Sequence, residues 1–240
     1  MAMGILDLPA PLFDLVDRSL LGVLPPLARL ILWAIAAAIL SLAIYRALSP
    51  QQRIAETKMA ALAARRRLNA HDGDLESAMP LMRRSMALAL RHVGLVMPAA
   101  LLASLPVLAL LVWLDGTYGH DLPNGQAPTI AVEPQAFAAE WRPNGAGGEI
   151  ELKDLQGAQV GHVMLEQPVT RIEKRHWWNI LVGNPAGYLP AQGPVEGVTI
   201  ALPERHYLPV GPDWLRSWFA IAFAALLVTS ILFMRVARIA

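Results

Sequence analysis

The chain has 240 residues, of which 55% are hydrophobic and only 16% are charged. Its mean hydropathy of +0.41 lies above the range of a soluble domain, whose charged fraction is about 25%. The formal net charge of +1 gives no sign of a nucleic-acid partner, so no DNA binding is expected, and the absence of cysteine excludes disulfides, thiol nucleophiles and thiolate metal sites.

The first 26 residues alternate apolar and acidic positions, with Asp7, Asp14 and Asp17 against a single Arg18. A cleavable signal peptide needs a basic N-terminal region, so none is predicted here. We expect residues 1–26 either to lie on the outer membrane surface as an amphipathic leader or to form a loosely ordered leader that ends at the Pro25-Pro26 turn.

Three apolar blocks, at 27–48, 93–114 and 214–234, predict membrane-spanning helices. Each block is close to the roughly 20 residues that cross the hydrocarbon core, and within that core a lipid-exposed segment satisfies its backbone only as a helix. Trp113, Trp214 and Trp218 stand at the ends of these blocks, where aromatic belt residues occur.

The orientation follows from the basic residues. Lys and Arg are concentrated in 49–92 and its edges and in the tail 235–240, whereas 115–213 is net acidic. The positive-inside rule therefore places the 49–92 segment and the C-terminus in the cytoplasm, and the N-terminus and 115–213 outside. We predict a multi-pass protein of a bacterial inner (cytoplasmic) membrane.

Residues 49–92 contain two helical patterns separated by the turn dipeptide Asp72-Gly73, which predicts a coiled-coil-like hairpin. The predicted apolar stripes consist of Ile54, Met59 (or Lys58), Ala61 and Leu62 in the first helix, and of Leu75, Met79, Met82, Met86 and Leu90 in the second. The Met-rich face is either the seam of the hairpin or an adaptable contact surface.

The arginines of this segment have two interpretations. They either enforce topology and touch lipid headgroups, or form a docking surface for a ribosome, an acidic partner or a nascent chain. The candidate docking residues are Arg65, Arg66, Arg67, Arg83 and Arg84.

Residues 115–213 have a different sequence pattern from the apolar blocks and the basic segment. Short alternating runs at 128–133, 149–154, 159–165 and 197–202 are separated by Gly, Pro and Asn turns, and residues 143–148 (PNGAGG) predict a hairpin loop. This pattern is typical of a small antiparallel β-sandwich or barrel. The aromatic cluster His176-Trp177-Trp178 with Tyr188 is expected to pack in a core or on a membrane-proximal face, with a sugar or peptide site as the alternative.

The predicted fold class is membrane α-helical: three transmembrane helices with a cytoplasmic helical hairpin, plus a small all-β extracytoplasmic domain between spans two and three. The sequence contains no HExxH, GxSxG, P-loop or dinucleotide motif, and its six histidines are scattered. We therefore expect a protein that is not an enzyme, with no catalytic residues, no metal and no cofactor.

Polar residues within the spans are informative because they are costly in hydrocarbon. They either snorkel and pack helices, or line an open groove that faces the cytoplasm and contacts a substrate. These groove candidates are Arg29, Ser41, Tyr45, Arg46, Ser104, Thr229 and Ser230.

The order of parts resembles the YidC/Oxa/Get membrane-insertase superfamily, above all its small three-span members, such as the archaeal YidC-like proteins and the catalytic subunit of the ER membrane complex. The likeness covers roughly 27–114 and 214–238, with local support from LSPQQRIAETKMAALAARRRL and DGDLESAMPLMRRSMALALRHVGLVMP. The resemblance implies an insertase with a hydrophilic intramembrane groove and a basic residue on the first span, here Arg46 or Arg29 by position. The β-rich insertion departs from the small members.

Two hypotheses follow. The first is a membrane-protein insertase or membrane chaperone, whose partners are the lipid bilayer and nascent or newly made membrane proteins, with a ribosome or an envelope complex as a further candidate. The alternative is a non-catalytic accessory or structural subunit of an envelope complex that binds a partner through its β-domain.

Overall fold

The computed structural model describes residues 3–19, 21–123, 127–144 and 147–237. The chain divides into two compact units, one of Met1–Ala34 with Leu108–Ala225 and the other of Ile35–Val107 with Leu226–Ala240. Residues 1–2 and 20 of the predicted leader, the 145–146 tip of the predicted hairpin loop and residues 238–240 of the predicted tail lie outside the described residues.

Within the described chain, three helices are long and apolar enough to cross a membrane: α2 (Pro26–Leu48), α4 (Leu75–Tyr118) and α6 (Trp218–Ala237). They contain the first two predicted spans and most of the third, and indicate a multi-pass membrane protein. The 44 residues of α4 extend about 66 Å at 1.5 Å per residue. Since that is about twice the hydrocarbon thickness, α4 is a membrane-length segment continuous with a projecting one.

The start of α6 differs from the predicted start at Trp214. A short helix, α5 (Asp213–Arg216), comes first, and Ser217 then adopts extended backbone with ψ at 154°. Ser217 Oγ accepts a hydrogen bond from Ala220 N at 3.4 Å, so this serine caps α6. A serine cap satisfies one of the free N–H groups that begin every helix, which explains why the long helix begins at Trp218.

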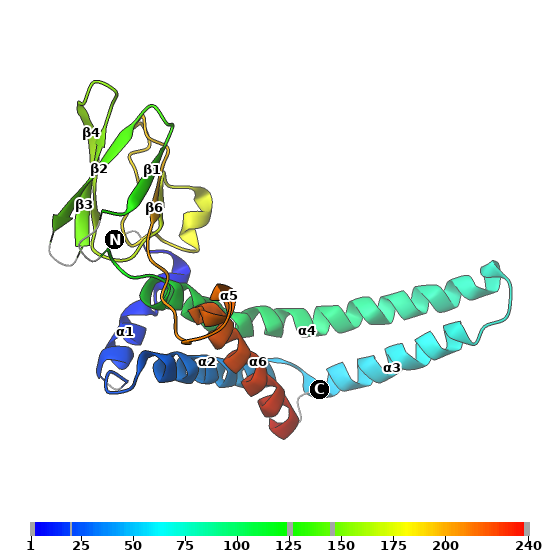
Figure 1. Ribbon diagram of the computed structural model, residues 1–240. Coiled ribbons are helices and arrows are strands. Elements are labelled where there is room, and N and C mark those ends of the chain that lie inside the picture. The colour runs from blue at the N-terminus through cyan, green and yellow to red at the C-terminus, as the bar shows by residue number, and fades with distance from the viewer. Residues whose placement is uncertain (1–2, 20, 124–126, 145–146, 238–240) are drawn as a thin grey trace. The chain divides into compact units, whose positions relative to one another are not determined.

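A helical hairpin is formed by α3 (Gln51–Asn69) and the first part of α4, which run antiparallel on either side of the turn (Figure 1). Ser77 Oγ donates to Asp74 O at 2.8 Å and lies 2.8 Å from His71 Nε2. With its proton directed to the carbonyl, this hydroxyl accepts from the imidazole, which ties the turn to the first residues of α4.

The buried face of the hairpin matches the predicted stripes only at Ile54 and Ala61. The buried or half-buried positions recur at alternating spacings of three and four: Ile54, Thr57, Ala61, Ala64 and Leu68 on α3, and Ala78, Leu81, Ser85, Leu88 and His92 on α4. This is the heptad spacing of a coiled coil. The prediction was wrong for Met59 and Leu62, which are 68% and 45% exposed, because most seam residues are small or weakly polar and a search for large apolar residues passes over them.

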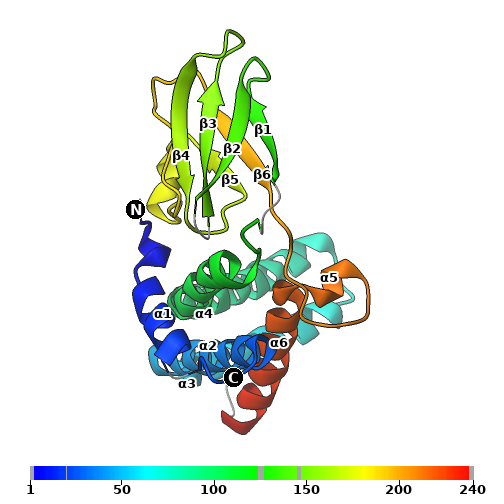
Figure 2. The ribbon, with the colours of Figure 1, turned by 60° about the vertical axis from the view of Figure 1, so that its left-hand side comes forward.

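The other unit contains two three-stranded antiparallel sheets (Figure 2). Their strand orders are β1 (Thr129–Glu133), β6 (Gly197–Ala201), β5 (Arg171–Glu173) in one sheet and β2 (Ala138–Asn144), β3 (Gly147–Lys153), β4 (Gln159–Leu165) in the other. Ile150 and Leu165 from one sheet share a core with Ile172 and Val198 from the other, and all four are fully buried. The predicted antiparallel β-sandwich is therefore confirmed.

Four of the strands match the predicted runs, and the pairing of Asn144 with Gly147 confirms the hairpin loop. The sequence did not predict β2 or β5. In β2 the run AAEWRPN has weak alternation and contains Pro143, and β5 has only three residues, so neither carries a clear period-two signal.

The predicted leader is helical, with a short 3₁₀ helix η1 (Ile5–Asp7) followed by α1 (Ala10–Ser19). This favours an ordered amphipathic segment over a loose leader. Its polar side chains are part of the site described below.

Trp141 covers a glycine on the neighbouring strand. A Cβ on Gly148 would lie 2.2 Å from two ring carbons of Trp141, and Gly148 is the diagonal cross-strand neighbour of that residue because Trp141 pairs with Ile150. The bare backbone of Gly148 thus provides the space in which the indole packs.

We expect Gly148→Ala to displace Trp141 and to destabilise the β-sandwich by about 1–3 kcal/mol, the usual cost of overpacking. Thermal unfolding followed by near-UV circular dichroism measures this loss. The matched control is Gly161→Ala on β4, where the added Cβ would meet only Leu152 Cδ1 at an ordinary 3.6 Å. Equal effects of the two substitutions would contradict this account of Trp141.

His92 Nδ1 in the hairpin seam is buried and has no hydrogen-bond partner among the described residues. A buried polar group without a partner costs about 1–3 kcal/mol. We therefore expect His92→Leu to stabilise the hairpin, measured as slower amide exchange in α3. The control is His71→Leu, which removes the contact to Ser77 and should speed amide exchange near the turn instead. If His92→Leu does not slow amide exchange in α3, His92 has a hydrogen-bond partner after all.

Candidate functional site

A continuous apolar stripe is exposed along the projecting part of α4. We define the α4 stripe as Leu75, Met79, Met82, Met86, Leu90, Val93 and Met97, which are between 47% and 81% exposed. At 100° per residue, it lies about 120° round the helix from the seam. The five predicted seam residues of α4 thus form this exposed face, so the interpretation of the Met-rich run as the hairpin seam was wrong.

The α4 stripe extends from the turn of the hairpin into the predicted second span. Leu75 is the first residue of α4, and Val93 and Met97 belong to the block that is apolar enough to cross a membrane. Four of the nine methionines of the chain lie on it. Methionine is flexible and polarisable, so such a face adapts to ligands of different shape.

All five predicted docking arginines are exposed, and none of their guanidinium groups forms an ion pair within the described part of the chain. Arg83 and Arg84 lie on the same projecting segment of α4 as the stripe. The hairpin therefore presents apolar surface and uncompensated positive charge together.

The predicted groove residues of this unit are partly committed to backbone. Ser41 Oγ donates to Ala103 O at 2.6 Å, and Ser104 Oγ donates to Leu101 O of its own helix at 2.8 Å. Arg46 Nη1 donates to Ala237 O, at the end of α6, at 2.8 Å. The first contact joins α2 to α4 and the last places a cation on the negative end of a helix dipole.

Tyr45, Thr229 and Ser230 are half-buried. Their hydroxyls have no hydrogen-bond partner in the described residues, in contrast to those of Ser41 and Ser104. Whether they line an open groove stays a prediction.

Arg29 lies in the other unit, in a buried polar cluster that the sequence did not predict. Asp17 is only 5% exposed. Its Oδ2 accepts from Arg29 Nη1 at 2.7 Å, and its Oδ1 accepts from Trp33 Nε1 at 3.0 Å and from Tyr118 Oη at 2.6 Å. This one carboxylate therefore joins α1 to α2 and to the end of α4.

Aromatic rings complete the cluster. Phe13, Trp33 and Trp113 meet pairwise at centroid distances of 5.1–5.5 Å in edge-to-face geometry, a favoured arrangement. Trp113 donates to Asp14 Oδ1 at 2.9 Å and is 6% exposed. This tryptophan is thus packed inside the protein, whereas the sequence placed it in an aromatic belt.

A tyrosine from the loop before α5 closes the cluster. Tyr207 Oη donates to Tyr118 O at 2.8 Å. Burial raises the pKa of Tyr207, so its phenol keeps the proton that it donates. In sequence, the available signal for this whole cluster was the pair Asp14 and Asp17, three residues apart in a segment that is otherwise apolar.

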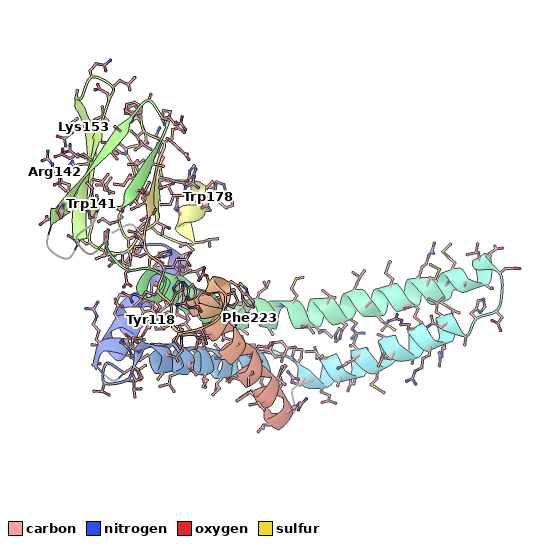
Figure 3. All side chains as sticks on the ribbon, viewed as in Figure 1. Tyr118, Trp141, Arg142, Lys153, Trp178 and Phe223 are labelled. Atoms are coloured by element: carbon pink, nitrogen blue, oxygen red, sulfur yellow. The ribbon has the colours of Figure 1, made fainter. Side chains whose placement is uncertain are left out.

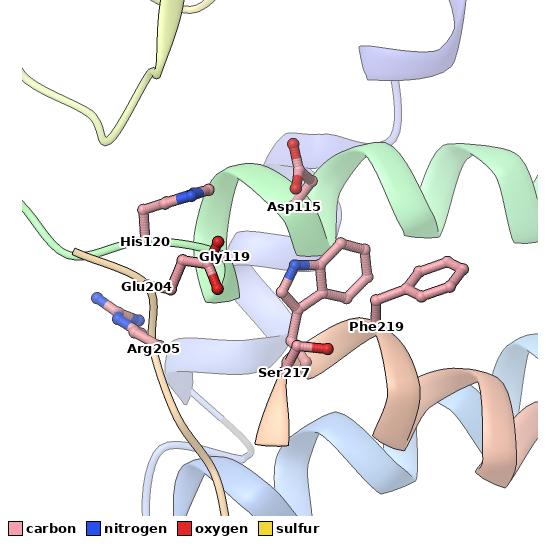
Figure 4. A pocket seen from close by; sticks show the side chains of 8 residues that line it. Asp115, Gly119, His120, Glu204, Arg205, Ser217 and Phe219 are labelled. Atoms are coloured by element: carbon pink, nitrogen blue, oxygen red, sulfur yellow. The ribbon is translucent and has the colours of Figure 1, made fainter. Parts of the chain in front are cut away.

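A cavity of about 330 Å³ lies in the same unit (Figure 4), lined by Asp115, Gly119, His120, Glu204, Arg205, Ser217, Trp218 and Phe219. Arg205 is engaged by Asp121 and by Thr117 O, and Ser217 Oγ donates to Trp214 O. The serine is therefore not aligned with His120 as a nucleophile with its base. Among the described residues, no three His, Asp or Glu are grouped closely enough to hold a metal ion.

Comparison of this chain with protein-family models, with curated proteins and with solved structures finds no match.

We expect Asp17→Ala to destabilise this unit by about 3–5 kcal/mol, because it leaves the half-buried Arg29 charge without its partner and the Trp33 and Tyr118 donors without their acceptor. Asp14→Ala is the control on the same helix. It removes the acceptor of Trp113 alone and should cost only about 1–3 kcal/mol. Thermal unfolding in detergent micelles measures both, and an Asp17→Ala variant as stable as Asp14→Ala would refute the assigned role of the carboxylate.

Proposed function

We propose that this chain is a membrane-protein insertase or membrane chaperone of a bacterial inner membrane, acting without a cofactor. The hairpin and the C-terminus are cytoplasmic, and the β-sandwich and the N-terminus are outside. The charge distribution supports this orientation, since the basic residues are concentrated in the hairpin and the β-sandwich segment is net acidic.

The observation that carries the proposal is the exposure of the α4 stripe. A soluble hairpin would bury Met79, Met82 and Met86 in its seam, but here the methionines face outward. The seam face of α4 consists of Ala78, Leu81, Ser85, Leu88 and His92 instead. The apolar stretch of a client gains free energy by covering this surface, at roughly 25 cal/mol per Å². Met-rich faces suit clients of varied sequence.

The α4 stripe continues into the predicted second span, so it leads from the turn of the hairpin toward the membrane. A client bound at Leu75–Leu90 finds further apolar side chains at Val93 and Met97, and beyond them the hydrocarbon itself. Polar flanks of the client are the obstacle, because a charged side chain at the bilayer centre costs about 2.5–3.5 kcal/mol or more. The free hydroxyls of Tyr45, Thr229 and Ser230 are the groups that we propose to shield such flanks, with Arg46 at the cytoplasmic end.

The five docking arginines of the hairpin attract partners electrostatically, at longer range than the apolar contacts of the α4 stripe. Because Arg65, Arg66, Arg67, Arg83 and Arg84 are unpaired, they attract an acidic partner such as ribosomal RNA or an anionic lipid surface. Their contribution should weaken as salt is raised.

The double substitution Met82→Gln and Met86→Gln should lower photo-crosslinking from Tyr45 to newly made membrane proteins by about tenfold, which corresponds to about 1.4 kcal/mol of lost binding. Met59→Gln on α3 is the control, since Met59 is at least as exposed as Met82 and Met86 but lies outside the α4 stripe. All variants should retain the helical content of the parent protein.

A different result would point to the accessory-subunit alternative. If probes on the α4 stripe and at Tyr45 capture no newly made protein, while a probe at Trp178 gives one stable product, the insertase proposal fails. The chain would then be a non-catalytic subunit that binds one envelope partner through its β-sandwich.

A further inference from the structure

Helix α1 has the reverse polarity of a surface helix in a soluble protein. Leu8, Leu12 and Leu15 recur at spacings of four and three residues and are all at least 60% exposed, whereas Asp17, on the opposite side, is 5% exposed. In water this arrangement leaves the leucines hydrated and gains nothing from the hydrophobic effect. An outward apolar side with inward carboxylates is typical of a segment whose outside is lipid.

A second exposed apolar surface is formed by η2 (Trp177–Ile180) and the residues after it, up to Val182. Trp177 is 77% exposed, and Ile180 and Leu181 are at least 50% exposed. Figure 3 shows Trp178 on the outside of the β-sandwich. The sequence favoured a core or a membrane-proximal face for these tryptophans, and the exposure rules out the core.

Backbone contacts join the two surfaces into one. Leu6 N donates to Leu181 O at 2.9 Å, and Asp7 Oδ2 accepts from Gly4 N at 2.7 Å and from Gly183 N at 2.6 Å. A Cβ on Gly4 would lie 2.5 Å from Leu181 O, so the approach requires glycine at this position. The start of the chain is thus fastened to the 177–183 loop.

We propose that this combined leader–loop surface, made of Ile5, Leu8, Leu12 and Leu15 with residues 177–182, inserts into the interfacial layer of the phospholipid bilayer. It thereby anchors the β-sandwich to the membrane. The inference rests on the membrane-spanning helices and is independent of the insertase proposal.

The position of α1 supports a lipid occupant. Asp17 holds Arg29 in the first turn of α2, and Asp14 holds Trp113 near the end of α4. Since α2 and α4 are both long enough to cross the bilayer, the start of α2 and the end of α4, which α1 contacts, are expected at its surface. The leucines of α1 are therefore held at the depth where hydrocarbon meets headgroups.

The chemistry of the loop supports the same occupant. Exposed Arg175 and His176 precede the two tryptophans, and the His176 ring stacks on Trp178 with centroids 4.2 Å apart. Tryptophan with flanking cations is the composition of membrane–water interfaces, where indoles sit at headgroup level and cations meet lipid phosphates.

The natural absence of cysteine permits a direct test with single nitroxide labels on the full-length protein. Leu12→Cys and Ile180→Cys report on the leader–loop surface. Leu155→Cys is the control, because Leu155 is 80% exposed in the turn between β3 and β4. The labelled protein is reconstituted in vesicles of phosphatidylcholine with a minority of phosphatidylglycerol, and collision rates are measured with oxygen, which partitions into lipid, and with a water-soluble nickel chelate.

We expect labels at 12 and 180 to collide mainly with oxygen and the label at 155 mainly with nickel. Aqueous behaviour at 12 and 180 would overturn the proposal, and protection from both reagents would overturn it in favour of a protein partner or a second copy. Asp7→Ala removes the carboxylate that accepts from Gly4 N and Gly183 N, a contact that we call the clamp. This variant should move the label at 180 toward aqueous behaviour while the label at 12 stays in lipid. An unchanged label at 180 would show that the clamp does not hold the loop at the membrane.

Discussion

The carboxylate of Asp17 accepts hydrogen bonds from three side chains on two other helices while lying almost entirely out of solvent. An ionised group in that position is tolerated only with a paired cation and well-placed donors, and Arg29, Trp33 and Tyr118 supply them. Because Asp17 must face inward to meet these donors, the leucines of α1 must face outward. One buried charge thus fixes the rotation of α1 and, through it, the surface that this unit presents.

The hairpin follows a related rule with different chemistry. Its seam combines small side chains such as Ala64, Ala78 and Ser85 with larger ones such as Ile54 and Leu81. The methionines of α4 lie on the exposed face instead. In both units, therefore, apolar side chains are turned outward, an arrangement that suits a protein surrounded by lipid.

Several parts of the fold were predictable from sequence, and the reason differs in each case. The long apolar helices and the strands at 159–165 and 197–201 have strong periodicity or length signals, and so they were found. The seam failed because alanine, serine and threonine score as neutral, and the Asp17 cluster failed because Arg29 and Tyr118 are separated from Asp17 by 12 and 101 residues. Of the candidate site, sequence located the exposed arginines and the Met-rich run, but which face of α4 is buried depends on the partner helix.

The clamp between Asp7 and Gly183 has a consequence for biosynthesis. Its two halves are separated by 176 residues, so at a translation rate of about 5–20 residues per second the first residues of the chain wait about 9–35 s for the segment that fastens them. During that interval the outward leucines of α1 have no β-sandwich beside them. Under the interfacial placement that we propose, these leucines meet lipid before the domain that Asp7 finally secures has been made.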